Sequence, residues 1–176
     1  LNINFLKLKK SDLGFYKFLS KISNQFQYSL DKKTNLDINP EIEINPFNID
    51  DNSLLAYNYS LKNVFYFNRS KQKFSLAFTF LENRLKNNFS FGSTKSSSLM
   101  KKINFIHKIG DLYLIEVVGN KQKKTNWSEN FQDKNYNIND YSINPKLTYY
   151  SGENNRINFI YKLSNIDNSI GNQESL

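Results

Sequence analysis

The sequence predicts an all-β protein, an antiparallel meander of about eight long strands. Two observations lead to this prediction. The chain contains 15 Phe and 11 Tyr beside one Trp and one Met, although its mean hydropathy is -0.63. These aromatic residues recur at every second position in several segments, which is the period of a strand, whereas a helix repeats every three or four residues. Aromatic side chains that alternate with polar ones favour a pleated sheet.

The first predicted strand runs from Phe18 to Leu30. Its odd positions are mostly Lys, Ser and Gln, and Asn24 interrupts the apolar set. The apolar even positions are Phe18, Ile22, Phe26, Tyr28 and Leu30. This strand is longer than the roughly 9 to 11 residues with which a tilted strand crosses a bilayer.

Residues 34–53 are predicted to form a long loop. The segment contains Pro40 and Pro46 and most of the nearby acidic residues. Because proline has no N–H to donate to a ladder, we expect at most a short edge piece at residues 41–44.

Alternation resumes in a predicted hairpin. One strand carries Tyr57, Tyr59, Leu61, Phe65 and Phe67, and the next carries Phe74, Leu76, Phe78 and Phe80. The connector between them, residues 70–73, is short and polar. Two alternating runs joined in this way predict antiparallel neighbours.

The pattern is weaker between Leu81 and Gly110. Residues 81–88 are the best helical candidate, although they are short and rich in Asn. Whether residues 87–109 form one strand or two stays open, because 93–98 (STKSSS) fits a turn or a polar stretch of a long strand. Gly110-Asp111 predicts a tight turn, since Gly tolerates positive φ. The strand that follows it is the most hydrophobic in the chain.

The last predicted hairpin pairs residues 138–150 with residues 156–163. Pro145 lies inside its first strand and suggests a bulge or an edge position. Before this hairpin, residues 123–137 are predicted to form a second long loop. Trp127 and Phe131 in that loop are candidates for contact with a ligand or partner, or for packing onto the rim of the sheet.

The net charge of +8 raises the question of nucleic acid. The cations are 21 Lys and only three Arg, and along the sequence they fall mostly at strand ends and turns. This distribution does not form the basic patch that phosphate binding requires, so no nucleic-acid partner is expected. The 28 Asn beside these Lys are what an AT-rich genome would encode.

Catalytic and metal-binding patterns are not found in the sequence. The chain has no Cys, and its one histidine, His107, has no accompanying ligand motif. Asp50 and Asp51 lack the spacing and the Gly of a calcium loop. We therefore expect no catalytic residue, no metal, no cofactor and no enzymatic activity.

Alternating strands are compatible with a soluble β-sandwich or with a transmembrane β-barrel. In a sandwich the apolar positions pack against a second sheet. Three features favour part of a barrel: apolar positions dominated by Phe and Tyr, strands longer than the usual five or six residues, and reverse positions of Ser, Asn, Gln and Lys that suit a wet lumen. No run approaches the roughly 18 apolar residues of a membrane helix.

The barrel interpretation predicts which side chains face lipid. The candidates are Phe26, Tyr28, Tyr59, Phe65, Phe67, Phe74, Leu76, Phe78, Phe80, Tyr149, Phe159 and Tyr161. The alternative function is a soluble binding module for glycan or protein, in which a sheet face or the Trp127 loop docks the partner.

Residues 45–74, 91–110 and 136–175 resemble the C-terminal region of large outer-membrane barrel proteins of Gram-negative bacteria. The likeness rests on strand rhythm and on anchors such as FNR at 67–69 and INPKLTYY at 143–150. It implies a barrel wall in the outer membrane with a structural, transport or surface-display role. Its partners would be the lipid bilayer and the remaining strands of the parent protein, with no specific ligand assignable.

We also expect residues 1–176 to be one barrel segment that is incomplete at both ends. The chain begins without Met or a signal peptide, and it ends in GNQESL, whereas barrels of this kind close on a strand with a terminal aromatic residue.

Overall fold

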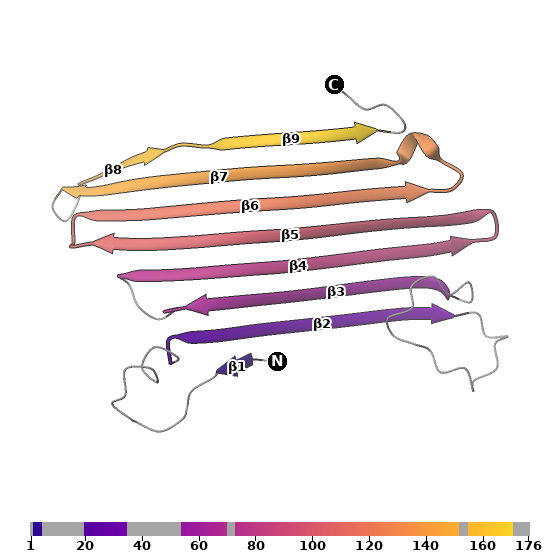
Figure 1. The fold of residues 1–176 in the computed structure, drawn as a ribbon, viewed down its shortest axis with the longest axis horizontal. Coiled ribbons are helices and arrows are strands. Elements are labelled where there is room, and N and C mark those ends of the chain that lie inside the picture. Colours follow the sequence, from indigo (N-terminus) through magenta and orange to yellow (C-terminus); the bar gives the residue numbers. More distant parts are fainter. Residues whose placement is uncertain (1, 5–19, 35–53, 70–72, 152–154, 171–176) are drawn as a thin grey trace.

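The described residues form one antiparallel sheet (Figure 1). The computed structural model describes residues 2–4, 20–34, 54–69, 73–151 and 155–170. The strands are β1 (Asn2–Asn4), β2 (Ile22–Thr34), β3 (Leu54–Phe67), β4 (Phe74–Phe89), β5 (Gly92–Ile109), β6 (Tyr113–Ser128), β7 (Tyr136–Ser151), β8 (Asn155–Ile160) and β9 (Leu163–Ile170). Each strand from β1 to β7 pairs with the next one along the chain, and β9 also pairs with β7. The predicted antiparallel meander is confirmed.

Strands β8 and β9 continue one another along the same edge of β7. The register is unchanged across the break, since Lys146 lies opposite Ile160 and Ile143 lies opposite Leu163. The break falls opposite Pro145, whose carbonyl accepts a hydrogen bond from the Tyr161 N–H at 3.1 Å. Pro145 has no N–H to return that bond, so the ladder is interrupted there. Pro145 therefore marks neither an edge nor a bulge, because β7 is paired on both sides.

The connections at the two ends of the sheet explain the strand boundaries. Residues 93–98 are a polar stretch of one long strand, β5, and the turn that precedes it lies between Phe89 and Gly92. Gly92 and Gly110 adopt φ values of 141° and 58°, which glycine tolerates best. Gly110 thus forms the predicted tight turn between β5 and β6. The helical candidate at residues 81–88 is strand, as cross-strand pairing overrides a weak local preference.

One predicted loop is shorter than expected. Residues 123–128 belong to β6 and residues 136–137 to β7, so the connection covers only residues 129–135 and contains a single 3-10 turn, Gln132–Lys134. Polar residues at 123–126 suggested a loop, but they continue the ladder with β5. The predicted loop at 34–53 and its edge piece at 41–44 lie outside the described residues, apart from Thr34, which ends β2. Phe18 also lies outside them.

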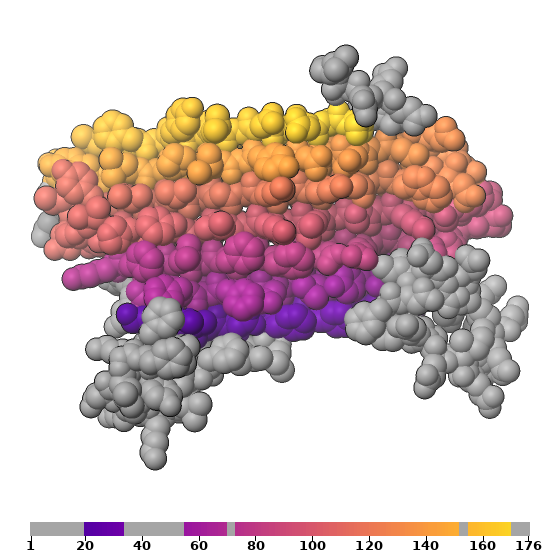
Figure 2. Space-filling model, viewed as in Figure 1, coloured from indigo at the N-terminus to yellow at the C-terminus, as the bar shows by residue number. Residues whose placement is uncertain are grey.

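The sheet is a single open layer. Among the described residues, only Tyr57 and Val64 are buried hydrophobic side chains, with 2% and 4% exposure. No described segment covers the strands on the side drawn in Figure 2. The β1 edge and the edge formed by β8 and β9 do not pair with each other in this part of the chain. The ladders and cross-strand contacts therefore hold the layer together without a second sheet.

Candidate functional site

The pairing register sorts the side chains of all strands onto two faces. Residues directly opposite each other in neighbouring strands share a face, and successive residues alternate. We call the apolar face the even residues of β2 and β4 together with the odd residues of β3 and of β5 to β9. The remaining strand residues make up the polar face. Side chains from distant parts of the sequence are thus placed side by side.

The apolar face carries a continuous band of large hydrophobic side chains. This apolar band comprises Ile22, Phe26, Tyr28, Leu30, Tyr57, Tyr59, Leu61, Phe65, Phe67, Phe74, Leu76, Phe78, Phe80, Ile103, Phe105, Ile109, Tyr113, Ile115, Val117, Tyr141, Ile143, Leu147, Tyr149, Ile157, Phe159 and Leu163. Tyr57 is buried, but members in the middle of the sheet are open: Phe65, Ile103 and Ile143 are 46%, 47% and 45% exposed. A patch of this size on a protein marks a surface that contacts another protein, a ligand or a membrane.

Tyrosines lie at the borders of the apolar band, and Phe, Ile and Leu fill its middle. Tyr113 and Tyr149 lie opposite each other near the Gly110 turn, with ring centroids 5.2 Å apart. At the far border, Tyr28 contacts Tyr59 edge to face at 5.7 Å. A tyrosine ring has an apolar body and a polar tip, so it is suited to a boundary between apolar and aqueous surroundings.

The apolar band runs obliquely to the strands. On β3 it extends from Phe67 as far as Tyr57, but opposite Tyr59 the next strand presents Arg84 on the same face. At the other border the band on β3 ends at Phe67. The register places Phe67 in line with Leu76, Phe105 and Val117 on the next three strands, but on β6 the band begins four residues before Val117, at Tyr113. Both borders therefore move toward the Gly110 turn between β3 and β6.

Two asparagines interrupt the apolar band and satisfy each other. The Asn24 side-chain amide donates to the Asn63 side-chain oxygen at 2.5 Å. Its second contact, with the Val64 carbonyl, is 3.5 Å long. Pairing keeps two polar groups from lying unsatisfied on an apolar surface.

Beyond the apolar band, the same face becomes basic on β4, β5 and β6. We call this region the basic end; its cations are Arg84, Lys86, Lys95, Lys101, Lys121 and Lys123. Arg84 pairs with Glu82 at 2.5 Å. Lys101 and Lys121 lie directly opposite each other, and the Lys121 ammonium lies 4.8 Å from the Tyr141 ring centroid.

The polar face is rich in Ser, Thr, Asn, Gln and Lys along its whole length. Its groups bind one another across strands: Lys146 pairs with Glu116 at 2.7 Å, and the Ser60 hydroxyl donates to the Asn83 side chain at 2.7 Å. Apolar residues interrupt it singly or in pairs, such as Leu81 opposite Met100, but they form no continuous band. One side of the layer is therefore suited to water and the other to an apolar phase.

The sequence-predicted lipid-facing residues gather on one face. Those that lie in strands all belong to the apolar face: Phe26, Tyr28, Tyr59, Phe65, Phe67, Phe74, Leu76, Phe78, Phe80, Tyr149 and Phe159. Tyr161 lies at the break between β8 and β9.

Trp127 and Phe131 do not share a loop. Trp127 lies on β6 at the basic end of the apolar face, with the Lys95 ammonium 5.8 Å from its ring centroid. Phe131 lies in the connection between β6 and β7, with the Lys134 ammonium 4.6 Å from its ring centroid. The prediction that both belong to one long loop is wrong, because the β6 ladder reaches Ser128.

His107 lies on the apolar face between two aromatic rings. Its ring centroid is 5.9 Å from that of Phe74 and 6.3 Å from that of Phe105, and its Nδ1 lies 3.1 Å from the Lys73 carbonyl oxygen. No group of three His, Cys, Asp or Glu side chains in the described residues is arranged to hold a metal ion. In the same residues, no helix is both long and apolar enough to cross a membrane.

The sequence interpretation missed the basic end. Its lysines come from separate strands, and only the register places them together. The sequence did indicate that these lysines share a face with apolar residues. Lys95 and Lys101 are odd-numbered like Ile103 and Phe105 on the same strand, and Lys121 is odd-numbered like Val117. Comparison of the chain with protein-family models, with curated proteins and with solved structures finds no match in any of the three.

Proposed function

We propose that this sheet is a segment of the wall of an outer-membrane β-barrel, with its apolar face toward lipid and its polar face toward the lumen. The role is structural, in transport or in surface display, and involves no catalysis. The observation that carries the proposal is the oblique, tyrosine-bordered apolar band on a single open layer. A soluble sheet of this size would need a second layer over that band.

Strand tilt accounts for the slope of the apolar band. Barrel strands in membranes tilt by roughly 40°, and neighbouring strands lie about 4.8 Å apart. The point at which a strand crosses the surface of the lipid layer is then displaced along the strand by about 4 Å, or about 1.2 residues, from one strand to the next. Over the three steps from β3 to β6 this amounts to about four residues. The border near the Gly110 turn moves from the level of Val117 to Tyr113, which agrees with this estimate, and the border at the basic end moves further, from the level of Trp127 to Val117.

The border tyrosines support the same orientation. Transmembrane barrels carry aromatic girdles at both interfaces of an apolar zone about 25 Å tall. Here Tyr113 and Tyr149 border one side of the band, and Tyr28 and Tyr59 border the other. The Ser, Asn, Gln and Lys of the polar face suit a water-filled interior.

The proposal is tested by inserting a charge on either face of one strand. Phe78 lies between Phe65 and Ile103 on the apolar face, and its neighbour Ala77 lies between Tyr66 and Asn104 on the polar face. We expect Phe78→Lys to destabilise the folded, lipid-inserted chain by about 2 to 4 kcal/mol and Ala77→Lys to cost much less. The measurement is equilibrium refolding of the complete parent barrel that contains this sheet into phosphatidylcholine vesicles, followed by the mobility difference between unheated and heated samples on a gel.

A soluble binding module predicts a different result. The chain would then be recovered as a monomer that melts cooperatively without detergent or lipid, and it would not pellet with vesicles. That outcome would refute the barrel-wall proposal.

A further inference from the structure

A shallow depression lies on the apolar face where the apolar band meets the basic end. It has a volume of about 470 Å³, and Phe78, Ile103, Ile143 and Leu163 line its apolar part. Its floor is Gly119, which lies opposite Ile103 on one side and Ile143 on the other. A Cβ placed on Gly119 would meet no atom within 4 Å, so the missing side chain creates open space there.

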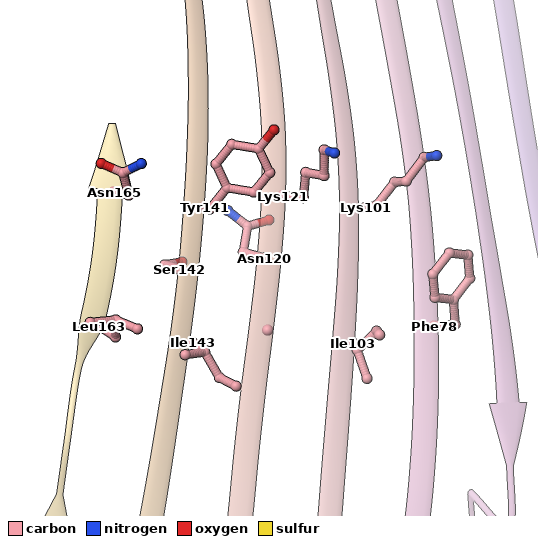
Figure 3. Close-up of a pocket in the computed structure, with 11 residues that line it drawn as sticks. Phe78, Lys101, Ile103, Asn120, Lys121, Tyr141, Ser142, Ile143, Leu163 and Asn165 are labelled. Atoms are coloured by element: carbon pink, nitrogen blue, oxygen red, sulfur yellow. The ribbon is translucent and has the colours of Figure 1, made fainter. Parts of the chain in front are cut away.

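Two lysines border this depression on its polar side. Figure 3 shows Lys101, Lys121 and Tyr141 on neighbouring strands, with Ile103 and Ile143 further along β5 and β7. Lys101 and Lys121 are directly opposite, and such like charges repel at a Cβ separation of about 5 Å. Within the part of the chain that the structure describes, neither forms an ion pair with a carboxylate. An anion between the two ammonium groups would relieve this repulsion.

The combination of a cationic pair and an apolar hollow selects an amphipathic anion. A phosphate binds well to two neighbouring ammonium groups, and an acyl chain attached to it would extend over Gly119 toward Phe78 and Leu163. A free phosphate would leave the apolar hollow unused, and a neutral lipid would leave the lysines unneutralised. The order of the two parts, charge at the border and hydrocarbon within the band, matches the order of a headgroup and its chain in a membrane.

We propose that this depression binds one acidic lipid, with the phosphate on Lys101 and Lys121 and an acyl chain over Gly119. The inference rests on the proposed function, because lipid reaches this face only if the apolar band lies in a bilayer. It adds a specific lipid site to a wall that would otherwise contact lipid without selection.

The experiment uses the complete protein that contains this sheet, in vesicles of phosphatidylcholine mixed with phosphatidylglycerol. After mild detergent extraction, mass spectrometry measures which lipid stays with the protein. We expect phosphatidylglycerol to be enriched over its share in the vesicles. Lys101→Gln with Lys121→Gln should reduce this enrichment by about thirtyfold, since each basic residue near an anionic surface contributes about fivefold. The matched control, Lys102→Gln with Lys124→Gln on the polar face, should leave it unchanged.

A second variant tests the acyl part of the site. Gly119→Leu fills the hollow without a backbone clash, and it should reduce retention of phosphatidylglycerol while insertion stays normal. Inorganic phosphate, added as a competitor, should displace little lipid. If phosphate competes fully and Gly119→Leu has no effect, the site binds free anions and the inference is wrong.

The two proposals fail in different ways. Normal insertion into pure phosphatidylcholine without any preference for phosphatidylglycerol would overturn the lipid site alone. Failure to insert into either vesicle would overturn the barrel wall, and the lipid site with it.

Discussion

Two regions of the apolar face lie on the same strands but differ in chemistry. Near the Gly110 turn the face is mostly Phe, Ile, Leu and Tyr, and toward the β4–β5 turn it is mostly Arg, Lys, Ser, Thr and Asn, with Leu99 and Trp127 among them. On β7 alone, Ile143 belongs to the first region and Asn137 to the second. A sheet that is buried in a soluble core is apolar along its full paired length. On β5, β6 and β7 the chemistry of this face changes partway along the strand, which is what the proposed barrel wall predicts.

The border between the two regions is also informative. In the proposed barrel wall this border would follow the surface of the lipid layer, and tyrosine lies along it on β3 and β7. Sequence periodicity alone reports which residues share a face of one strand. The position at which that face changes from apolar to basic reports how the strand is oriented in its surroundings.

The largest expected effect comes from placing a charge in the apolar region. Ile143→Lys should destabilise the lipid-inserted chain by about 2 to 4 kcal/mol, because the ammonium group would lie in hydrocarbon. Asn137→Lys, six residues earlier on the same face of β7, should cost only about 0 to 1 kcal/mol near the interface. Denaturant titration in vesicles compares the two. Equal costs would contradict the difference between the regions.

The strands and faces were predictable because they depend on local alternation. Phe74 to Phe80 repeat with period two, and the structure pairs them with β3 and β5 in the expected order. The end of β6 was not predictable, since Thr125 and Asn126 have loop-like polarity and are held by pairing with Ser97 and Ser96. Polarity identifies a loop only where the surrounding sheet does not supply a ladder partner.

A smaller effect is expected from the polar pair within the apolar band. Asn63→Ala leaves the Asn24 amide without its 2.5 Å partner, which should cost about 1 to 3 kcal/mol. Replacing both residues, Asn24→Leu with Asn63→Leu, removes the unsatisfied group and should be close to neutral. A double-mutant cycle on the stability of the inserted chain measures the coupling. Additive effects of the single changes would show that the two amides do not depend on each other.

Pro145 offers a test in the opposite direction. Pro145→Val supplies the N–H that β7 lacks opposite Tyr161, and one added ladder hydrogen bond should stabilise the sheet by about 0.5 to 1.5 kcal/mol. Slower hydrogen exchange along β8 and β9 would show that the two strands have become continuous. Unchanged exchange there would mean that the missing donor does not cause the break.

The candidate site divides into a part that the sequence predicts and a part that it does not. The lipid-facing aromatics follow from parity within each strand. The depression at Gly119 requires Ile103 and Ile143 to lie on either side of a glycine, and the cationic pair requires Lys101 to lie opposite Lys121. These residues are 16 or more positions apart in sequence, so whether they are neighbours depends on the pairing register of the strands. That register follows from the position and length of each turn, which the sequence alone does not fix.

The smallest expected effect lies outside the apolar band, at the Gly110 turn. The Lys108 ammonium donates a hydrogen bond to the Asp111 carboxylate at 2.9 Å. This hydrogen bond and the positive charge of Lys108 lower the pKa of Asp111 below its ordinary value of 3.8. A lowered pKa in the folded state stabilises the fold above pH 3.8, and this contribution is lost as the pH falls through the lowered value. The Asp111 side chain is 96% exposed, so salt should screen the effect strongly. Asp111→Asn should therefore remove a small decrease in the free energy of unfolding at acidic pH. It should leave the free energy of unfolding at neutral pH almost unchanged. Carbon-detected NMR titration of the Asp111 carboxyl measures the pKa directly, and a midpoint at or above 3.8 would contradict the Lys108 contact.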